Sequence, residues 1–150
     1  MKKLISFLPL LLIISCASVQ TPEPRVFSTP NRTKKQIYNR TIQWVSENFR
    51  SGKEVVQYKN LEEGRIICQG VATVRPGMDL YERGFEFTWV IDIKPNRIRL
   101  KYKNIQPRHM GNVAGLEYNS LGARYIDNKI DSMVNSLLQY IKNPGGKSDW

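Results

Sequence analysis

The sequence has 150 residues and a formal net charge of +10. A chain of this length forms one domain with a sizeable core, and its basic balance favours anionic partners. A single histidine, with no cluster of carboxylates or thiols at ligand spacing, argues against a metal site.

The N-terminus has the pattern of a secretory signal. Lys2 and Lys3 give it a positive start, and residues 4–14 form an uncharged apolar run. A helix of that length spans roughly 16 Å, about half of the hydrocarbon thickness, which is too short for a transmembrane anchor. The sequence therefore predicts a signal peptide over residues 1–15 and no second membrane segment.

The signal ends at a cysteine. Residues 13–16, Ile-Ile-Ser-Cys, resemble the lipobox of bacterial lipoproteins, in which aliphatic, variable and small residues precede a required cysteine. The resemblance implies that Cys16 carries a diacylglyceryl thioether, that cleavage occurs before it, and that the new amine is acylated. Two or three acyl chains make a stable anchor. The alternative is a plain signal peptide with a chance cysteine.

The residues after the cysteine predict a destination and a tether. Ala17 stands where an aspartate would signal retention in the inner membrane, so we expect an outer-membrane lipoprotein that faces the periplasm. Residues 16–24 then form the lipidated end and a proline-bearing spacer. Loss of residues 1–15 lowers the formal charge to +8 and leaves Cys68 as the only free thiol, so no intramolecular disulfide is expected.

The domain is expected to span residues 25–142, beginning with a weak strand signal at residues 25–28. Thr33 and Gln36 form a capping box, which predicts a helix over residues 34–49. Its apolar residues recur every three or four positions and include Trp44, which we expect in the core.

Strand signals follow at residues 54–59 and 64–75, and then in a clear hairpin. Residues 85–94 and 97–105 both alternate apolar and polar side chains on either side of Pro95-Asn96. With a two-residue turn, Trp89 faces Tyr102 on the apolar side and Asp92 faces Arg99 on the polar side. A slip by one residue would place apolar side chains beside cations, so it is disfavoured.

A loop over residues 106–119 leads to a last amphipathic helix, residues 121–142, and a tail, residues 143–150. Asn119 or Ser120 can cap this helix. The order is β-α-β-β-β-β-α. We therefore predict an α+β, two-layer domain in which two helices cover one face of an antiparallel sheet.

Three stretches together resemble a known family. They are IYNRTIQWVSENF, VVQYKNLEEGRIICQG and FTWVIDIKPNRIRLKYKNI. They are similar to the bacterial domain-of-unknown-function family DUF4468, which is described as having a fold like the TATA-binding protein (TBP). The resemblance covers about residues 25–142 and implies a TBP-like fold in the cell envelope. It implies no activity, ligand or cofactor.

The hairpin supplies the strongest candidate binding face. Four cations, Arg97, Arg99, Lys101 and Lys103, lie on one face of one strand at a spacing that could follow an anionic polymer. Asp92 and Glu86 on the paired strand would partly neutralise them.

Three interpretations of this face remain open. In the first, it is a solvated surface. In the second, it binds an anionic envelope protein, lipid or glycan. In the third, it binds nucleic acid. Nucleic acid fits least, because the chain is expected to be exported and because Trp89 and Tyr102 are expected to point to the opposite face, leaving no stacking platform.

An enzymatic alternative rests on few groups. Cys68 with His109 could form a nucleophile and base, and Asp92 or Glu86 could act as a catalytic carboxylate. Cys68, however, alternates with apolar residues in mid-strand, which predicts a buried thiol. Arg108, His109 and Met110 are expected at an exposed loop tip. We therefore predict a non-enzymatic binding lipoprotein without a metal or cofactor.

Overall fold

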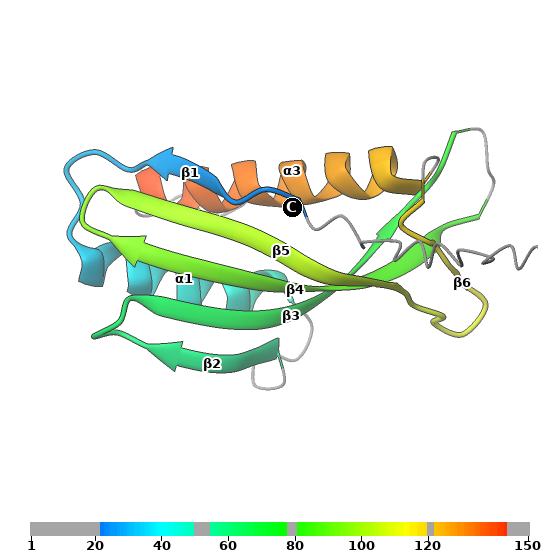
Figure 1. Cartoon of the computed structure of the whole chain (residues 1–150), viewed down its shortest axis with the longest axis horizontal. Helices are drawn as coiled ribbons and strands as arrows, with labels where there is room; N and C mark the ends of the chain where they lie inside the picture. The colour runs from blue at the N-terminus through cyan, green and yellow to red at the C-terminus, as the bar shows by residue number, and fades with distance from the viewer. Residues whose placement is uncertain (1–21, 50–54, 78–80, 120–121, 144–150) are drawn as a thin grey trace, which may run out of the picture.

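The computed structural model describes residues 22–49, 55–77, 81–119 and 122–143. The predicted signal peptide, Cys16, most of the tether and residues 144–150 lie outside these described residues. The elements, labelled as in Figure 1, are β1 (Arg25–Ser28), α1 (Lys34–Asn48), β2 (Val56–Asn60), β3 (Arg65–Val74), β4 (Arg83–Lys94), β5 (Arg97–Pro107), β6 (Ala114–Gly115) and α3 (Gly122–Lys142).

The strands form a single sheet in the order β1-β5-β4-β3-β2. Neighbours along this path are antiparallel, and the short β6 pairs with β4 in parallel. Both α1 and α3 lie against one face of the sheet, and the other face is turned to the viewer in Figure 1. The predicted two-layer α+β architecture is confirmed.

The first helix begins as its capping box predicts. The Thr33 side chain accepts the amide of Gln36, and the Gln36 side chain accepts the amide of Thr33. The side chains of Arg32 and Arg40 donate to the last carbonyls of α3, at Lys142 and Ile141, where a helix has no amide partners of its own. The two helices are thereby linked at this end.

The hairpin of β4 and β5 has the predicted register. Ile93 faces Ile98, Ile91 faces Leu100 and Trp89 faces Tyr102. Pro95 fixes its own φ, and Asn96 has a φ of 60°, which is the pattern of a type II turn rather than of the primed turns that hairpins favour. Contacts outside the hairpin hold this turn, because the backbone amides of Thr29 and Arg32 donate to Asn96.

Aromatic side chains dominate the layer between sheet and helices. Trp89 stacks on Trp44 with ring centroids 5.8 Å apart, and Phe49 and Phe87 meet Trp89 edge-on. Gly70 on β3 makes room for two of them, since a Cβ there would lie 2.5 Å from Phe87 Cζ and 2.9 Å from Phe49 Cε1. As predicted, Trp44 belongs to the core.

The expected fourteen-residue loop at 106–119 is wrong in part. β5 continues to Pro107, Met110 and Val113 form a bridge, and β6 adds to β4. The carbonyl of Gly84 accepts the amides of both Arg108 and Leu116, which brings this segment back onto the sheet. A two-residue strand has too few positions for an alternating pattern, so the sequence carries no signal for it.

Smaller differences concern element ends. β2 begins at Val56, two residues after the expected start, and β4 begins at Arg83, two residues before it. The last helix is described from Gly122, whose amide donates to the side chain of Asn119, one of the two predicted caps.

Candidate functional site

The uncovered face of the sheet, called here the open face, carries side chains from every strand of the main path. Because strand residues alternate, the polar set predicted for β4 and β5 lies on this face, opposite the helices. Basic side chains outnumber acidic ones on it. They are Arg65, Lys94, Arg97, Arg99, Lys101 and Lys103, against Asp92 and Glu86.

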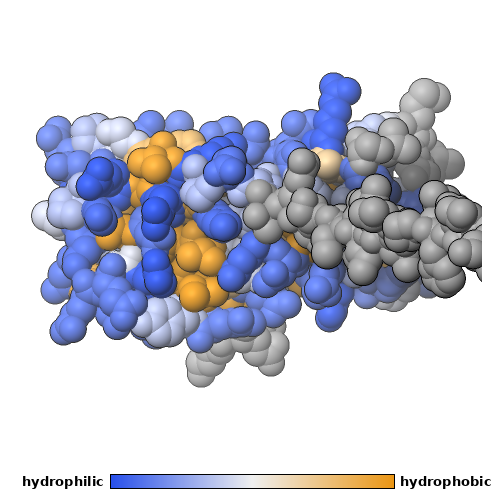
Figure 2. Space-filling model, in the orientation of Figure 1, coloured by the Kyte–Doolittle hydropathy of each residue, from blue (hydrophilic) through white to orange (hydrophobic). Residues whose placement is uncertain are grey.

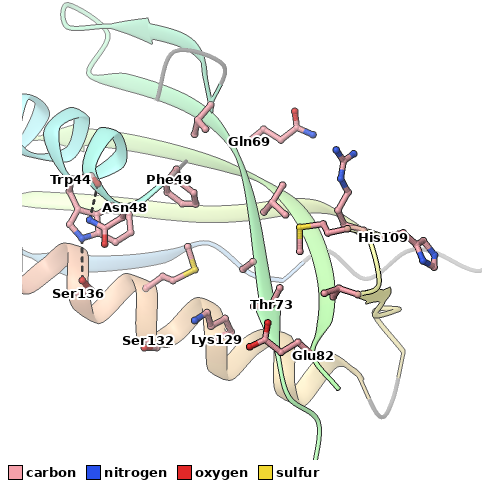
Figure 3. A pocket seen from close by; sticks show the side chains of 17 residues that line it. Trp44, Asn48, Phe49, Gln69, Thr73, Glu82, His109, Lys129, Ser132 and Ser136 are labelled. Atoms are coloured by element: carbon pink, nitrogen blue, oxygen red, sulfur yellow. Dashed lines mark hydrogen bonds between the residues drawn. The ribbon is translucent and has the colours of Figure 1, made fainter. Parts of the chain in front are cut away.

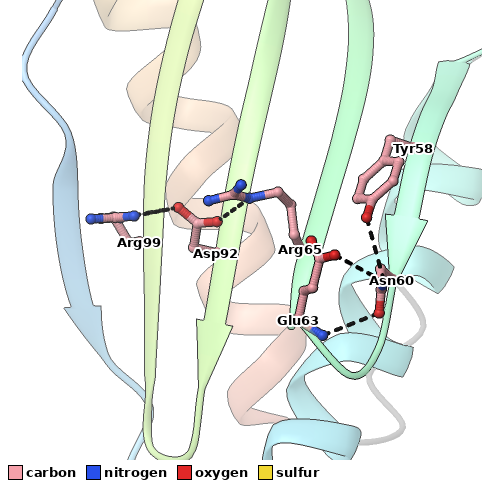
Figure 4. Close-up of polar contacts among 6 residues, drawn as sticks. All are labelled: Tyr58, Asn60, Glu63, Arg65, Asp92 and Arg99. Atoms are coloured by element: carbon pink, nitrogen blue, oxygen red, sulfur yellow. Dashed lines mark hydrogen bonds and ion pairs between the residues drawn. The ribbon is translucent and has the colours of Figure 1, made fainter.

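Asp92 is held between two arginines from neighbouring strands (Figure 4). Arg65 on β3 donates its Nε to Oδ1 at 2.7 Å, and Arg99 on β5 donates its Nη2 to Oδ2 at 2.6 Å. Burial raises the pKa of Asp92, but the hydrogen bonds and charges of Arg65 and Arg99 outweigh it and lower the pKa below the usual value. The carboxylate therefore stays ionised and neutralises Arg99.

The predicted pair of Asp92 with Arg99 is confirmed, and Arg65 is a partner that sequence reasoning missed. Arg65 sits directly opposite Asp92 in the register of β3 and β4. Just before β3, Asn60 and Glu63 contact each other across the turn that leads into Arg65 (Figure 4). These contacts stabilise the turn and thereby position Arg65 on the open face.

Glu86 does not neutralise the cations of β5, which corrects our expectation. Its partner is Arg108, with Nη1 and Oε2 3.3 Å apart. A bulge between Glu86 and Thr88, opposite residues 103–106, separates this pair from Lys103, and Asn104 at the bulge has a φ of 53°.

Four cations of the open face make no ion pair within the described part of the chain. They are Lys94, Arg97, Lys101 and Lys103. Arg97 stands opposite Lys94, Lys103 opposite Thr88, and Lys101 opposite Val90. Like charges placed side by side are unfavourable without counter-ions, so an anion bound here would relieve repulsion.

An apolar row lies beside these cations. Tyr58, Ile67 and Val90 are opposite one another across β2, β3 and β4, and Lys101 continues the row on β5. In Figure 2 apolar surface lies in the middle of this face and polar surface surrounds it. Val26 on β1, 61% exposed, adds apolar surface beyond Arg99. The face thus combines positive charge with apolar contact area.

The model of the domain of unknown function (DUF4468) with TBP-like fold matches residues 24–107, more than half of the chain. This chain belongs to the DUF4468 family. The match ends with β5, so α3 lies beyond it, and the resemblance expected over residues 25–142 is confirmed for its larger part.

Solved structures share the fold of this DUF4468 protein. A TBP-like protein from Parabacteroides distasonis has a TM-score of 0.64 at 11% identity and covers 81% of this chain and 92% of its own. A DUF4468 family protein from Bacteroides ovatus has a TM-score of 0.62 at 13% identity and covers 85% of this chain and 93% of its own. No curated protein matches. These likenesses support the fold and assign no ligand.

The aromatic side chains of this DUF4468 domain lie where the sequence predicts. Trp89 and Tyr102 point toward the helices, and the hydroxyl of Tyr102 donates to Asp127 on α3 at 2.8 Å. Burial raises the pKa of Tyr102, and the hydrogen bond and negative charge of Asp127 raise it further. Tyr58 is exposed on the open face, but it lies on β2, three strands away from β5.

Cys68 faces the helix layer and is 1% exposed, as predicted. Burial raises the pKa of its thiol to about 12, so the reactive thiolate is scarce at neutral pH. His109 is exposed and lines a groove to which Cys68 does not contribute. The described residues contain no group of three or more His, Cys, Asp or Glu side chains that could hold a metal ion.

The membrane anchor expected at Cys16 lies outside the described residues. Within the described ranges no helix has the length and hydropathy needed to cross a bilayer.

Proposed function

We propose that this protein is a lipid-anchored envelope lipoprotein whose domain binds an anionic partner through the open face, without catalysis. The observation that carries the binding part is the row of Arg97, Lys101 and Lys103 on β5. These cations have no carboxylate partner within the described residues, because Asp92 forms its ion pairs with Arg65 and Arg99, and Glu86 forms its ion pair with Arg108.

The chemistry of the face supports an envelope protein, lipid or glycan over nucleic acid. Anionic groups would contact Lys101 and Lys103, and apolar groups would contact Val90 and Ile67 beside them. Single-stranded nucleic acid is usually held by aromatic side chains interleaved with cations, and no aromatic side chain of the described residues stands next to the β5 cations on this face.

The anchor part rests on the lipobox-like residues 13–16. We expect the full-length chain in a Gram-negative host to incorporate alkyne-palmitate and to lose residues 1–15. Cys16→Ala should abolish both labelling and cleavage. Cys68→Ala is the matched control and should keep both, because Cys68 is buried in the core. Labelling of the Cys16→Ala protein would contradict the anchor.

Photo-crosslinking in the host tests the binding face. A photoreactive residue at Thr88 or Val90, on the open face, should give discrete adducts, whereas one at Asn135 or Gln139, exposed on α3, should not. Equal adducts from both surfaces would contradict a specific face.

A charge series sharpens this experiment. Arg97→Gln with Lys101→Gln and Lys103→Gln should abolish the adducts, and Arg99 is kept because it stabilises Asp92. The control removes three exposed cations elsewhere, Lys35→Gln with Lys59→Gln and Arg124→Gln, and should keep the adducts. Adducts that survive the first triple substitution would show that the β5 cations only face solvent.

A further inference from the structure

A groove runs beside the part of β3 that β2 does not reach (Figure 3). The pairing of β2 with β3 ends at Val56 opposite Cys68, and β3 continues to Val74. Among the described strands none pairs with this edge of β3 beyond Cys68. The groove has a volume of about 830 Å³, within the range of pockets that hold ligands.

Both faces of β3 line this groove. Ala72 points toward the helices, whereas Val71 and Thr73 point to the open face, because successive strand residues alternate. A single groove can contact side chains on both faces of β3 only if it runs along the edge of that strand. Figure 3 agrees, with Trp44 and Ser136 on one side of the β3 ribbon and His109 on the other.

We call this hollow the β3-edge groove and define it by two walls. The inner wall, on the helix side, consists of Trp44, Phe49, Ala72 and Met133, and the outer wall consists of Val71, Thr73, Arg108 and Met110.

The inner wall is apolar, and its accessible part comes mainly from the half-buried Ala72 and Met133, because Trp44 and Phe49 are only 2% and 7% exposed. Trp44 donates its indole N–H to Ser136 Oγ at 3.1 Å, so its polar group is already satisfied. Phe49 packs edge-on against Trp44, and Met133 lies against the core. An apolar side chain entering here would gain contact area and displace no hydrogen bond of the tryptophan.

The chain that follows β5 supplies Arg108 and Met110 of the outer wall. A Cβ on Gly84 would lie 2.4 Å from the carbonyl oxygen of Arg108 and 3.1 Å from Met110 Cε, so this segment rests on β4 only because residue 84 is glycine. The ion pair of Arg108 with Glu86 holds the segment in place.

The groove carries more positive than negative charge. Lys129 on α3 and Arg108, which also pairs with Glu86, line the groove, and Glu82 is the one carboxylate among its described lining residues. Lys129 forms no ion pair with any described residue. An acidic group in the groove would therefore be favoured over a basic one.

We propose that the β3-edge groove binds an extended peptide whose side chains alternate between apolar and acidic, by addition of a strand to β3. The peptide backbone pairs with those amides and carbonyls of β3 residues 69–74 that point away from β4 and that no described strand reaches. Its apolar side chains contact the inner wall, and its acidic side chains point to the outer wall near Arg108. This site uses none of the β5 cations, so the groove proposal can be tested independently of the proposed binding at the open face.

The test uses the full-length chain in lipid nanodiscs and a displayed library of random hexapeptides. We expect the enriched peptides to alternate apolar and acidic residues with a period of two. N-methylation of alternate peptide amides should weaken binding by about tenfold or more, since it removes the backbone hydrogen bonds. Saturating peptide should also slow hydrogen exchange at residues 69–74.

Two pairs of substitutions locate the site. Ser132→Trp fills the groove from an exposed position on α3 and should abolish binding, whereas Asn135→Trp, exposed on the same helix outside the groove, should not. Arg108→Gln should weaken the binding of acidic peptides more than that of neutral ones, and Lys35→Gln on α1 should leave both unchanged.

Three results would overturn the proposal. One is a library with no sequence enriched over the Ser132→Trp protein, and another is a set of peptides that bind equally well when N-methylated. The third is a dimer of the full-length chain that Ser132→Trp dissociates, which would make the occupant a second copy of this chain.

Discussion

The two faces of this sheet are built from the same strands and differ in how far their side chains are buried and paired. On the helix side, Trp89, Ile91 and Ile93 of β4 are almost wholly buried and are surrounded by partners. On the open side, the intervening Val90 is half-buried, and Lys101 opposite it has no ion-pair partner among the described residues. One face therefore stabilises the fold, and the other is left available for binding.

Truncation of the core should have the largest effect. Trp89→Ala removes the ring that stacks on Trp44 and meets Phe49 and Phe87, so we expect the free energy of unfolding to fall by about 3–5 kcal/mol. Val90→Ala, one residue away on the open face, should cost about 1 kcal/mol or less. Urea denaturation of both variants measures the difference, and equal losses would contradict the contrast between the faces.

Overpacking of the core should come next. Gly70→Ala places a methyl group against Phe87 and Phe49, which should lower the free energy of unfolding by about 1–3 kcal/mol. Gln69→Ala, at the neighbouring residue on the open face, should cost about 1 kcal/mol or less. If Gly70→Ala is as stable as the parent protein, the aromatic packing described here is wrong.

The Asp92 pair should give a smaller effect that depends on pH. The pKa of Asp92 is lower in the folded protein than the ordinary value of about 4, so its ionised form stabilises the fold above that value. This contribution is lost as the pH falls below about 4 and through the folded pKa. Both arginines are partly exposed to solvent, so Asp92→Asn should cost only about 1 kcal/mol at pH 7.

The denaturation midpoints of parent and Asp92→Asn proteins, followed from pH 7 to pH 2.5, measure this dependence. The two should converge at the acid end. A difference that is constant over this range would show that Asp92 is not stabilised by its charge.

The smallest effect on stability is expected from the cations themselves. Arg97→Gln with Lys101→Gln and Lys103→Gln should change the free energy of unfolding by less than about 0.5 kcal/mol per residue, because no described residue pairs with them. A loss of several kcal/mol in thermal or urea denaturation would mean that these side chains support the fold. In that case a loss of binding could not be assigned to the face.

Period-two and helical patterns predicted most of the fold. The register of the β4–β5 hairpin could be predicted because the Pro95-Asn96 turn is short enough to fix it. The pair of Asp92 and Arg99 follows from that register. The contact of Arg65 with Asp92 could not be predicted, because the connection between β3 and β4 is longer and leaves their register undetermined from sequence.

The site residues that were missed depend on irregular structure. Glu86 pairs with Arg108 because β5 bulges at Asn104, and a bulge shifts every later residue relative to its expected neighbour. The β3-edge groove exists because β2 begins only at Val56, opposite Cys68, while β3 continues to Val74, and strand ends are poorly specified by composition. The face was thus predictable, and its boundaries were not.

Lysine footprinting in native membranes tests the central claim, a partner on the open face, most directly. Acetylation rates are compared between the full-length protein in isolated host envelopes and the same protein purified into nanodiscs. We predict slower acetylation of Lys101 and Lys103 in the envelope, and equal rates in both settings for Lys35 and Lys59, which lie away from the open face. Equal rates for all four lysines would contradict a binding role for this face.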